Sequence, residues 1–206
     1  MIDPVTLLAF IPAALALNLT PGADMMFCLG QGLRSGRLPA VAASAGVAAG
    51  GMVHVTLAGL GLGAAVAAMP GLFDVIRWAG VAYLLYLAWG ALRHGPAKGK
   101  ALAVPARRAF RAGFFVNLTN PKVILFVLAF VPQFVRPEAG PVLAQFLVFG
   151  AVLALGGFAV NGLVGVFAGH AGQRLTGSPV FARWLGRVSA GIFAGLALRL
   201  AIMERA

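Results

Sequence analysis

The residues most able to do chemistry lie in two short polar stretches that interrupt apolar parts of the chain. The first spans positions 18–24 and the second positions 117–122. Each combines a proline with side chains that form hydrogen bonds, and each adds one charged group. We predict that both stretches build one binding site, made of Asn18, Thr20, Pro21, Gly22 and Asp24 together with Asn117, Asn120, Pro121 and Lys122.

The two charges, Asp24 and Lys122, suit the binding of a zwitterion. The carboxylate would face an ammonium group and the ammonium a carboxylate, while the helix starts after Pro21 and Pro121 offer free N–H groups to an anion. Asp24 could also take up a proton. The alternatives are that Asp24 and Lys122 form a structural ion pair, and that the asparagines and threonines satisfy their own helix backbones.

Two further polar residues, His54 and Asn161, lie inside apolar runs. A histidine titrates near neutral pH, so His54 is a candidate proton relay beside Asp24. The alternative is a structural histidine held by a hydrogen bond. Asn161 is expected to bond to a neighbouring helix, as most polar side chains in membrane bundles do.

Other chemistries find little support in the sequence. Cys28 is the single cysteine, so it forms neither an intrachain disulfide nor a CxxC pair, and three scattered histidines build no metal cluster. No GxxxxGK[ST] motif is present to bind ATP. Hydrolysis would need a nucleophile beside a base or a metal, which is also missing. The sequence therefore predicts no enzyme, no metal site and no cofactor.

Composition indicates the elements that carry these residues. Of 206 residues, 61% are hydrophobic and only 10% are charged, whereas a soluble domain has about 25% charged residues. A hydrocarbon core of roughly 30 Å needs about 20 apolar residues in each helix. Six apolar runs are long enough, and they cover residues 4–31, 39–68, 72–92, 112–134, 142–168 and 184–202. We therefore expect an all-α membrane protein with six transmembrane helices, of which the first and fourth are broken at Pro21 and Pro121.

The net charge of +11 is explained by the positive-inside rule rather than by nucleic-acid binding. Most of the basic residues fall on one side if both termini lie outside the cytoplasm. The predicted inner residues are Arg34, Arg37, Arg93, Lys98, Lys100, Arg107, Arg108, Arg111, Arg174, Arg183 and Arg187. The predicted outer ones are Arg77, Arg136, Arg199 and Arg205.

The chain contains an internal repeat. A shift of 106 residues lays Gly50-Gly51 on Gly156-Gly157 and Arg77-Trp78 on Arg183-Trp184. Three helices in each half require the second half to be inverted relative to the first. We predict one transmembrane domain over residues 1–206, with repeats at 1–93 and 112–206 joined by a basic cytoplasmic loop at 94–111.

The polar stretches occupy matching places in the two halves. Asn18-Leu19-Thr20-Pro21 corresponds to Asn117-Leu118-Thr119-Asn120-Pro121 at offsets of 99 and 100 residues. A proline in a spanning helix removes one backbone hydrogen bond and blocks another, which is tolerated where the freed groups are buried in protein or face water. Counted from the nearest inner arginine at ~1.5 Å per residue, Asp24 and Lys122 lie about 15 to 17 Å deep, near the bilayer centre.

Several motifs are spread over nearly the whole chain: Asn18 to Met25, Phe114 to Lys122, Phe130 to Phe134, Trp78 to Leu87, and His54. Together they resemble the lysine exporter (LysE/RhtB) family. Family members often read Pro-Gly-Pro where this chain has Pro21-Gly22-Ala23, so the first helix should resume one residue sooner here.

The resemblance implies a secondary-active exporter of amino acids or close derivatives in the bacterial inner membrane, driven by proton antiport. Its partners would be the amino acid, protons and the lipid bilayer. GxxxG spacings at Gly59/Gly63 and Gly165/Gly169 leave a homodimer open, with packing inside the monomer as the first expectation. The alternatives are a transporter of another small solute or ion, and a membrane assembly protein without transport.

Overall fold

The computed structural model describes residues 2–68 and 104–168, together with single positions within 75–92 and 180–201. These residues form helices, turns and connecting segments, and none of them belongs to a strand. The elements in chain order are α1 (Pro4–Leu19), α2 (Ala23–Ser35), α3 (Arg37–Ala68), α5 (Ala106–Leu118), α6 (Pro121–Ala129), η1 (Val131–Phe134), η2 (Pro137–Ala139) and α7 (Val142–Val166).

The predicted breaks in the first and fourth helices are confirmed. The axes of α1 and α2 meet at 55° across Pro21, and those of α5 and the segment Pro121–Phe134 meet at 54°. Gly22 is the N-cap of α2, which resumes at Ala23. Asn120 caps α6, where Pro121 occupies the first turn, a position at which the missing N–H of proline costs nothing.

The long helices α3 and α7 correspond to the predicted second and fifth runs. Residues 37–61 of α3 and 142–166 of α7 are each long and apolar enough to cross a membrane. The described residues thus hold two such spans, or up to four if each bent pair counts as one. The predicted third and sixth helices, 72–92 and 184–202, lie mostly outside the described residues.

The start of the fourth helix differs from the prediction. We expected a loop up to position 111 and a helix from 112, but α5 begins at Ala106 and its first turns contain Arg107, Arg108 and Arg111. Arginine is a good helix former. Its aliphatic stem can lie along apolar surface while the guanidinium reaches water. The basic residues therefore extend the helix instead of ending it.

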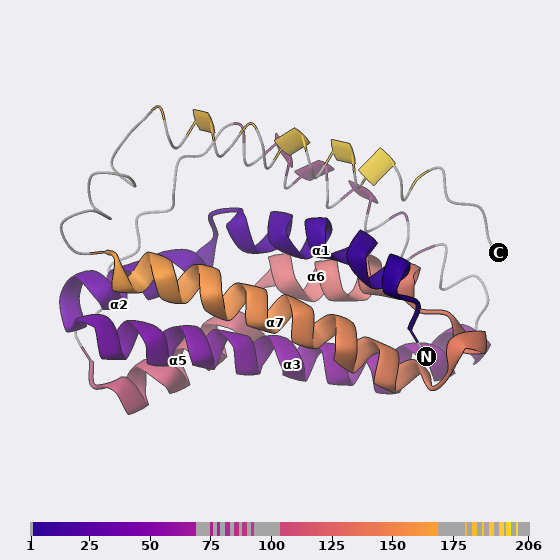
Figure 1. Cartoon of the computed structure of the whole chain (residues 1–206), viewed down its shortest axis with the longest axis horizontal. Coiled ribbons are helices and arrows are strands. Elements are labelled where there is room, and N and C mark those ends of the chain that lie inside the picture. The colour runs from indigo at the N-terminus through magenta and orange to yellow at the C-terminus, as the bar shows by residue number, and fades with distance from the viewer. Residues whose placement is uncertain are drawn as a thin grey trace.

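Each broken helix packs against the long helix of the other half. Figure 1 shows α3 and α7 running along the long axis of the molecule, and α3 packs on both α5 and α7. The first broken pair, α1 and α2, packs on α7. The two halves of the sequence are therefore interleaved. The helix breaks at Pro21 and Pro121 both face the middle of the molecule.

Glycines allow these helices to approach closely within the monomer. A Cβ at Gly46 of α3 would collide with the backbone of Phe110, and a Cβ at Gly113 of α5 would collide with that of Ala43. Gly59, from one of the GxxxG spacings, faces Phe146, and Gly165, from the other, faces Ala40. These two glycines thus pack within the monomer, as first expected.

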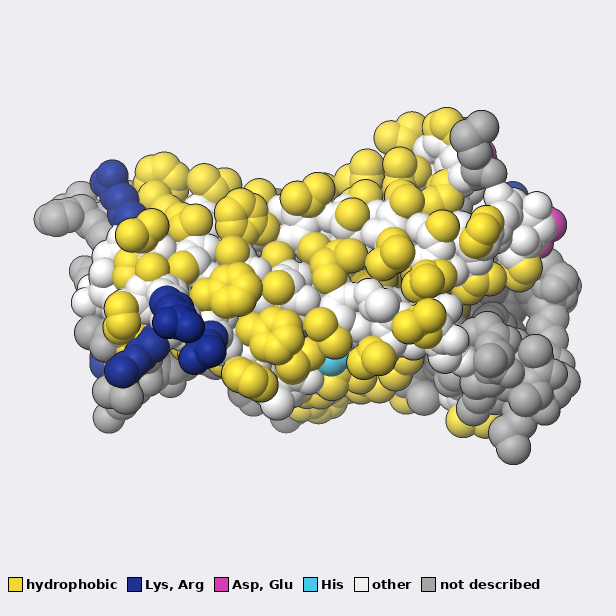
Figure 2. Space-filling model, turned by 90° about the horizontal axis from the view of Figure 1, so that it is seen from below, with side chains coloured by type: hydrophobic (Ala, Val, Ile, Leu, Met, Phe, Trp, Pro, Cys, Tyr) yellow, Lys and Arg dark blue, Asp and Glu magenta, His cyan; other side chains and the backbone are white. Residues whose placement is uncertain are grey.

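The surface shows a long apolar flank with charge concentrated at the ends. In Figure 2 most of the visible Lys and Arg side chains gather at the end where α2 finishes and α3 and α5 begin. The described basic residues of these elements are Arg34, Arg37, Arg107, Arg108 and Arg111. Such a distribution fits a molecule with an apolar belt and one strongly basic face.

The glycine contacts lead to a test of packing. Gly46→Ala should lower the free energy of unfolding by about 1–3 kcal/mol, because the backbone of α5 must move away. Gly61→Ala on the same helix has open space around its Cβ, so it should be neutral or stabilising by up to ~1 kcal/mol. Thermal unfolding of both variants in detergent measures the difference. Equal effects would show that close approach at Gly46 does not matter.

Candidate functional site

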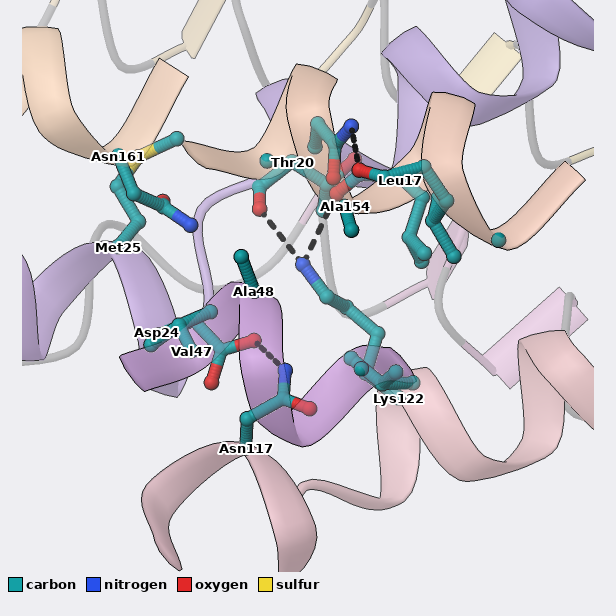
Figure 3. A pocket seen from close by; sticks show the side chains of 16 residues that line it. Leu17, Thr20, Asp24, Met25, Val47, Ala48, Asn117, Lys122, Ala154 and Asn161 are labelled. Carbon is teal, nitrogen blue, oxygen red and sulfur yellow. Dashed lines mark hydrogen bonds between the residues drawn. The ribbon is translucent and has the colours of Figure 1, made fainter. Parts of the chain in front are cut away.

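A small cavity lies between the two helix breaks (Figure 3). Its volume is about 30 Å³, which is room for roughly two water molecules. Apolar side chains from α1, α2, α3, α6 and α7 form much of its wall. The polar residues that line it are Asn18, Thr20, Asp24, Asn117, Lys122 and Asn161.

The structure brings most of the predicted site residues together around this cavity. Five of them line it directly, namely Asn18, Thr20, Asp24, Asn117 and Lys122. The others shape the backbone beside it: Pro21 and Pro121 at the breaks, Gly22 and Asn120 as helix caps. A Cβ at Gly22 would lie 3.1 Å from the Lys122 ammonium, so this glycine leaves room for the Lys122 side chain.

Lys122 satisfies the carbonyl that Pro21 leaves without a partner. In a continuous helix the N–H of residue 21 would bond to the carbonyl of Leu17, but proline has no N–H. The Lys122 ammonium donates instead to the carbonyl oxygens of Leu17 and Thr20, each at 3.0 Å. A cation at a helix C-terminus is favoured by the helix dipole. Lys122 therefore joins the start of α6 to the end of α1.

His54 takes the equivalent place at the second break. Pro121 frees the carbonyl of Asn117, and the Nε2 atom of His54 lies 3.2 Å from that oxygen. Because a carbonyl only accepts, this hydrogen bond needs the proton on Nε2, which leaves Nδ1 to accept or to take a second proton. The Asn120 N–H also reaches the Asn117 oxygen, at 2.9 Å. His54 does not line the cavity, but it contacts Asn117, which does.

Asp24 is held by Asn117. The Asn117 side-chain amide donates to Oδ2 of Asp24 at 2.9 Å, and both residues are buried. Oδ1 of Asp24 and Oδ1 of Asn117 form no hydrogen bond among the described residues. Asp24 lies in the first turn of α2, where the helix dipole favours a negative charge.

The structural ion pair between Asp24 and Lys122, which was the alternative interpretation, is not formed in the described part of the chain, where the two charges have different partners. Figure 3 shows the carboxylate bonded to Asn117 and the ammonium bonded to backbone oxygens on another side of the cavity. The physical reason is competition for the ammonium. The carbonyl freed by Pro21 needs a donor inside an apolar bundle, and Lys122 supplies it.

The two break asparagines pack in a reciprocal way. Asn18 donates to the carbonyl of Leu153 at 3.1 Å, and a Cβ at Gly156 would lie 2.7 Å from its amide nitrogen. Asn117 rests in the same manner on Gly50, where a Cβ would lie 3.0 Å from its amide oxygen. Each asparagine thus lies against the glycine pair of the opposite half.

Thr20 and Asn120 also serve their own backbones, as the alternative interpretation expected. The Thr20 hydroxyl donates to the carbonyl of Ala16 at 2.6 Å. The Asn120 side-chain oxygen accepts from the Lys122 N–H at 3.0 Å. Both residues therefore have a structural role in forming the breaks, and only Thr20 lines the cavity as well.

Asn161 was not predicted to belong to the site, and the expectation that it bonds to a neighbouring helix is wrong for the described residues. It lines the cavity from α7, and Figure 3 shows its amide beside Met25. The sequence does contain a signal. Asn161 lies four residues after Gly157, so both share the helix face against which Asn18 rests.

The described residues offer no group of three or more His, Cys, Asp or Glu side chains suited to hold a metal ion. Cys28 is buried and free, and it packs with Ala43, Val47 and Ala109. The polar groups that line the cavity thus include amides, one carboxylate and one ammonium. Such groups bind a small polar molecule through hydrogen bonds and opposite charges.

Comparison with known proteins identifies the relatives of this chain. It is 36% identical over 145 residues to a homoserine/homoserine lactone efflux protein of Salmonella typhimurium, a match that covers 69% of this chain and 70% of that one. It is 29% identical over 200 residues to a leucine efflux protein of Enterobacter sp., covering 95% and 94% of the two chains. No solved structure matches it. The model of the LysE type translocator family matches residues 15–204, and the chain belongs to this family.

Proposed function

We propose that this protein is a secondary-active exporter of amino acids or close derivatives in the bacterial inner membrane. The observation that carries the proposal is the cavity at the paired breaks, where Asp24 and Lys122 present opposite charges without neutralising each other. An amino acid carries the complementary pair. Its ammonium would bind Asp24 through the oxygen that has no partner among the described residues, and its carboxylate would bind Lys122.

Family relatives support amino acids as the substrate class. The proteins named above are described as exporters of homoserine, homoserine lactone and leucine. Homoserine and leucine share the zwitterionic backbone and have uncharged side chains, and the lactone keeps the amino group that Asp24 would bind. One carboxylate and one ammonium in the cavity suit such a molecule better than a basic or acidic amino acid, which would bring a further charge into an apolar bundle.

Transport requires the walls of the site to move. The cavity of about 30 Å³ is several times too small for an amino acid, since it has room for roughly two water molecules. The bends of 55° and 54° provide two matched places at which helices can change direction. We infer that the halves rock about the site and open it alternately to either side, as in other carriers built from repeats.

The inverted repeat belongs to this proposal. Three features support it: the nearly equal bends, the reciprocal asparagine–glycine contacts, and the packing of each broken helix on the long helix of the other half. The basic end formed by α2, α3 and α5 would face the cytoplasm, and both termini would then lie outside.

Proton antiport would supply the energy. One carboxylate oxygen of Asp24 has no partner among the described residues, and the other accepts a hydrogen bond from the side-chain amide of Asn117. The backbone carbonyl of Asn117 in turn accepts a hydrogen bond from His54. Asp24 and His54 thus contact the same residue, Asn117, from two sides. Protonation of Asp24 would release the amino-acid ammonium, and His54 would carry the proton to or from it.

Charge removal tests the binding site. Asp24→Asn and Lys122→Met should each weaken substrate binding by about 2 kcal/mol or more, roughly 30-fold, because a buried charge would lose its partner. Counterflow of labelled amino acid in proteoliposomes measures the loss, and accelerated exchange would also distinguish a carrier from a channel. Ser44→Ala is a suitable control, because the buried Ser44 hydroxyl donates to Phe158 and does not line the cavity. Full activity of both charge variants would contradict the proposal.

Orientation has a separate test. A reporter that is active only in the cytoplasm should be active when inserted at Pro105, just before α5. The reason is that this end of the molecule carries the arginines of α2, α3 and α5. A reporter at Asp3 should give the opposite result. Extracellular labelling at Pro105 would show that the topology is the reverse.

His54 provides the test of coupling. His54→Gln keeps a donor for the Asn117 carbonyl but has no group that titrates. Counterflow at a fixed pH should persist in this variant, while uptake or efflux driven by an imposed pH gradient should fall to a small part of the wild-type rate. Equal retention of both activities would remove His54 from the proton path.

A further inference from the structure

Asn161 stands out among the buried amides of the described residues. It is 5% exposed, it lies in the C-terminal third of α7, and its amide makes no hydrogen bond among these residues. Asn18, Asn117, Asn120 and Gln145 are just as buried or partly buried, yet each of them makes at least one hydrogen bond. An amide without a partner in an apolar bundle is costly, so this amide needs a partner inside the cavity that it lines, either water or a ligand.

The place of Asn161 suggests which part of a ligand it meets. It lines the same cavity as Asp24 and Lys122, and in Figure 3 the three side chains approach the cavity from different sides. In the proposed function, on which this inference rests, the two charges hold the ammonium and the carboxylate of the amino acid. Asn161, on another wall of the cavity, is then placed to contact the side chain of the bound amino acid.

The chemistry of the amide defines the group that it recognises. An asparagine offers both donors and an acceptor, so it can bind a hydroxyl, which also donates and accepts. Beside it lies Met25, whose flexible side chain can adapt to aliphatic carbons. We propose that Asn161 is the specificity-determining residue of the site and hydrogen-bonds a hydroxyl on the side chain of the amino acid.

The expected effect is discrimination between amino acids with and without a side-chain hydroxyl. A site built to bond a hydroxyl discriminates strongly against the analogue without it, because the amide would then stay unpaired. L-homoserine and L-2-aminobutyrate differ only in this hydroxyl, which makes them a matched pair of probes. The wild-type protein should exchange L-homoserine at least about tenfold better than L-2-aminobutyrate.

Substitution of Asn161 tests the assignment. Asn161→Leu, similar in size but apolar, should lower L-homoserine counterflow by roughly tenfold and leave L-2-aminobutyrate counterflow unchanged or higher. Asn161→Ser should restore part of the preference, since it keeps a hydroxyl that can bond. The control Ser44→Ala, on the neighbouring α3 and outside the cavity lining, should keep the wild-type ratio.

The outcomes separate this inference from the proposed function. If wild type exchanges both probes equally, or if Asn161→Leu lowers both by the same factor, Asn161 has no part in specificity, while amino-acid exchange stands. If wild type exchanges neither probe nor any other amino acid, the proposed function fails as well. A selective loss of L-homoserine exchange, with a thermal stability in detergent like that of Ser44→Ala, supports the assignment.

Discussion

Two prolines leave two backbone carbonyls without their helical partners in an apolar bundle, and the arrangement of the site depends on how these carbonyls are satisfied. An unpaired carbonyl in such surroundings costs on the order of 1–3 kcal/mol. Lys122 donates to the Leu17 oxygen and His54 to the Asn117 oxygen. In both cases a basic side chain from another helix meets the negative end of a helix dipole. The breaks therefore fix where these two titratable groups lie.

This constraint explains why the cavity keeps two separate charges. Because Lys122 is engaged with the end of α1, Asp24 turns to the Asn117 amide and to the start of its own helix. Each charge is stabilised by neutral dipoles instead of by the other charge, which avoids the cost of an isolated buried ion. Oppositely charged groups that are stabilised in this way stay available to a ligand that brings both complements.

The sequence predicts the breaks well, because they depend on local chemistry. Pro12 lies inside α1 without breaking it, so the proline alone is not the signal; Pro21 and Pro121 differ by their asparagine and threonine neighbours. The partners of the charges could not be predicted, since Leu17 and Lys122 meet only through the tertiary packing. The same holds for Asn161, whose role depends on the groups across the cavity. The start of α5 was missed because a run of arginines was interpreted as a loop.

In the proposed exporter, the double use of Lys122 connects binding to shape. Its ammonium has three N–H groups, and two of them hold the Leu17 and Thr20 carbonyls at the end of α1. A substrate carboxylate would draw the ammonium toward the cavity and weaken one or both of these bonds, so the angle between α1 and α2 would lose part of its restraint. A ligand shifts an equilibrium only by its different affinity for the two states. The substrate carboxylate and the carbonyls at the end of α1 compete for the Lys122 ammonium, so the substrate binds better when those carbonyls have released it. This difference in affinity acts at the bend between α1 and α2, which must move during transport.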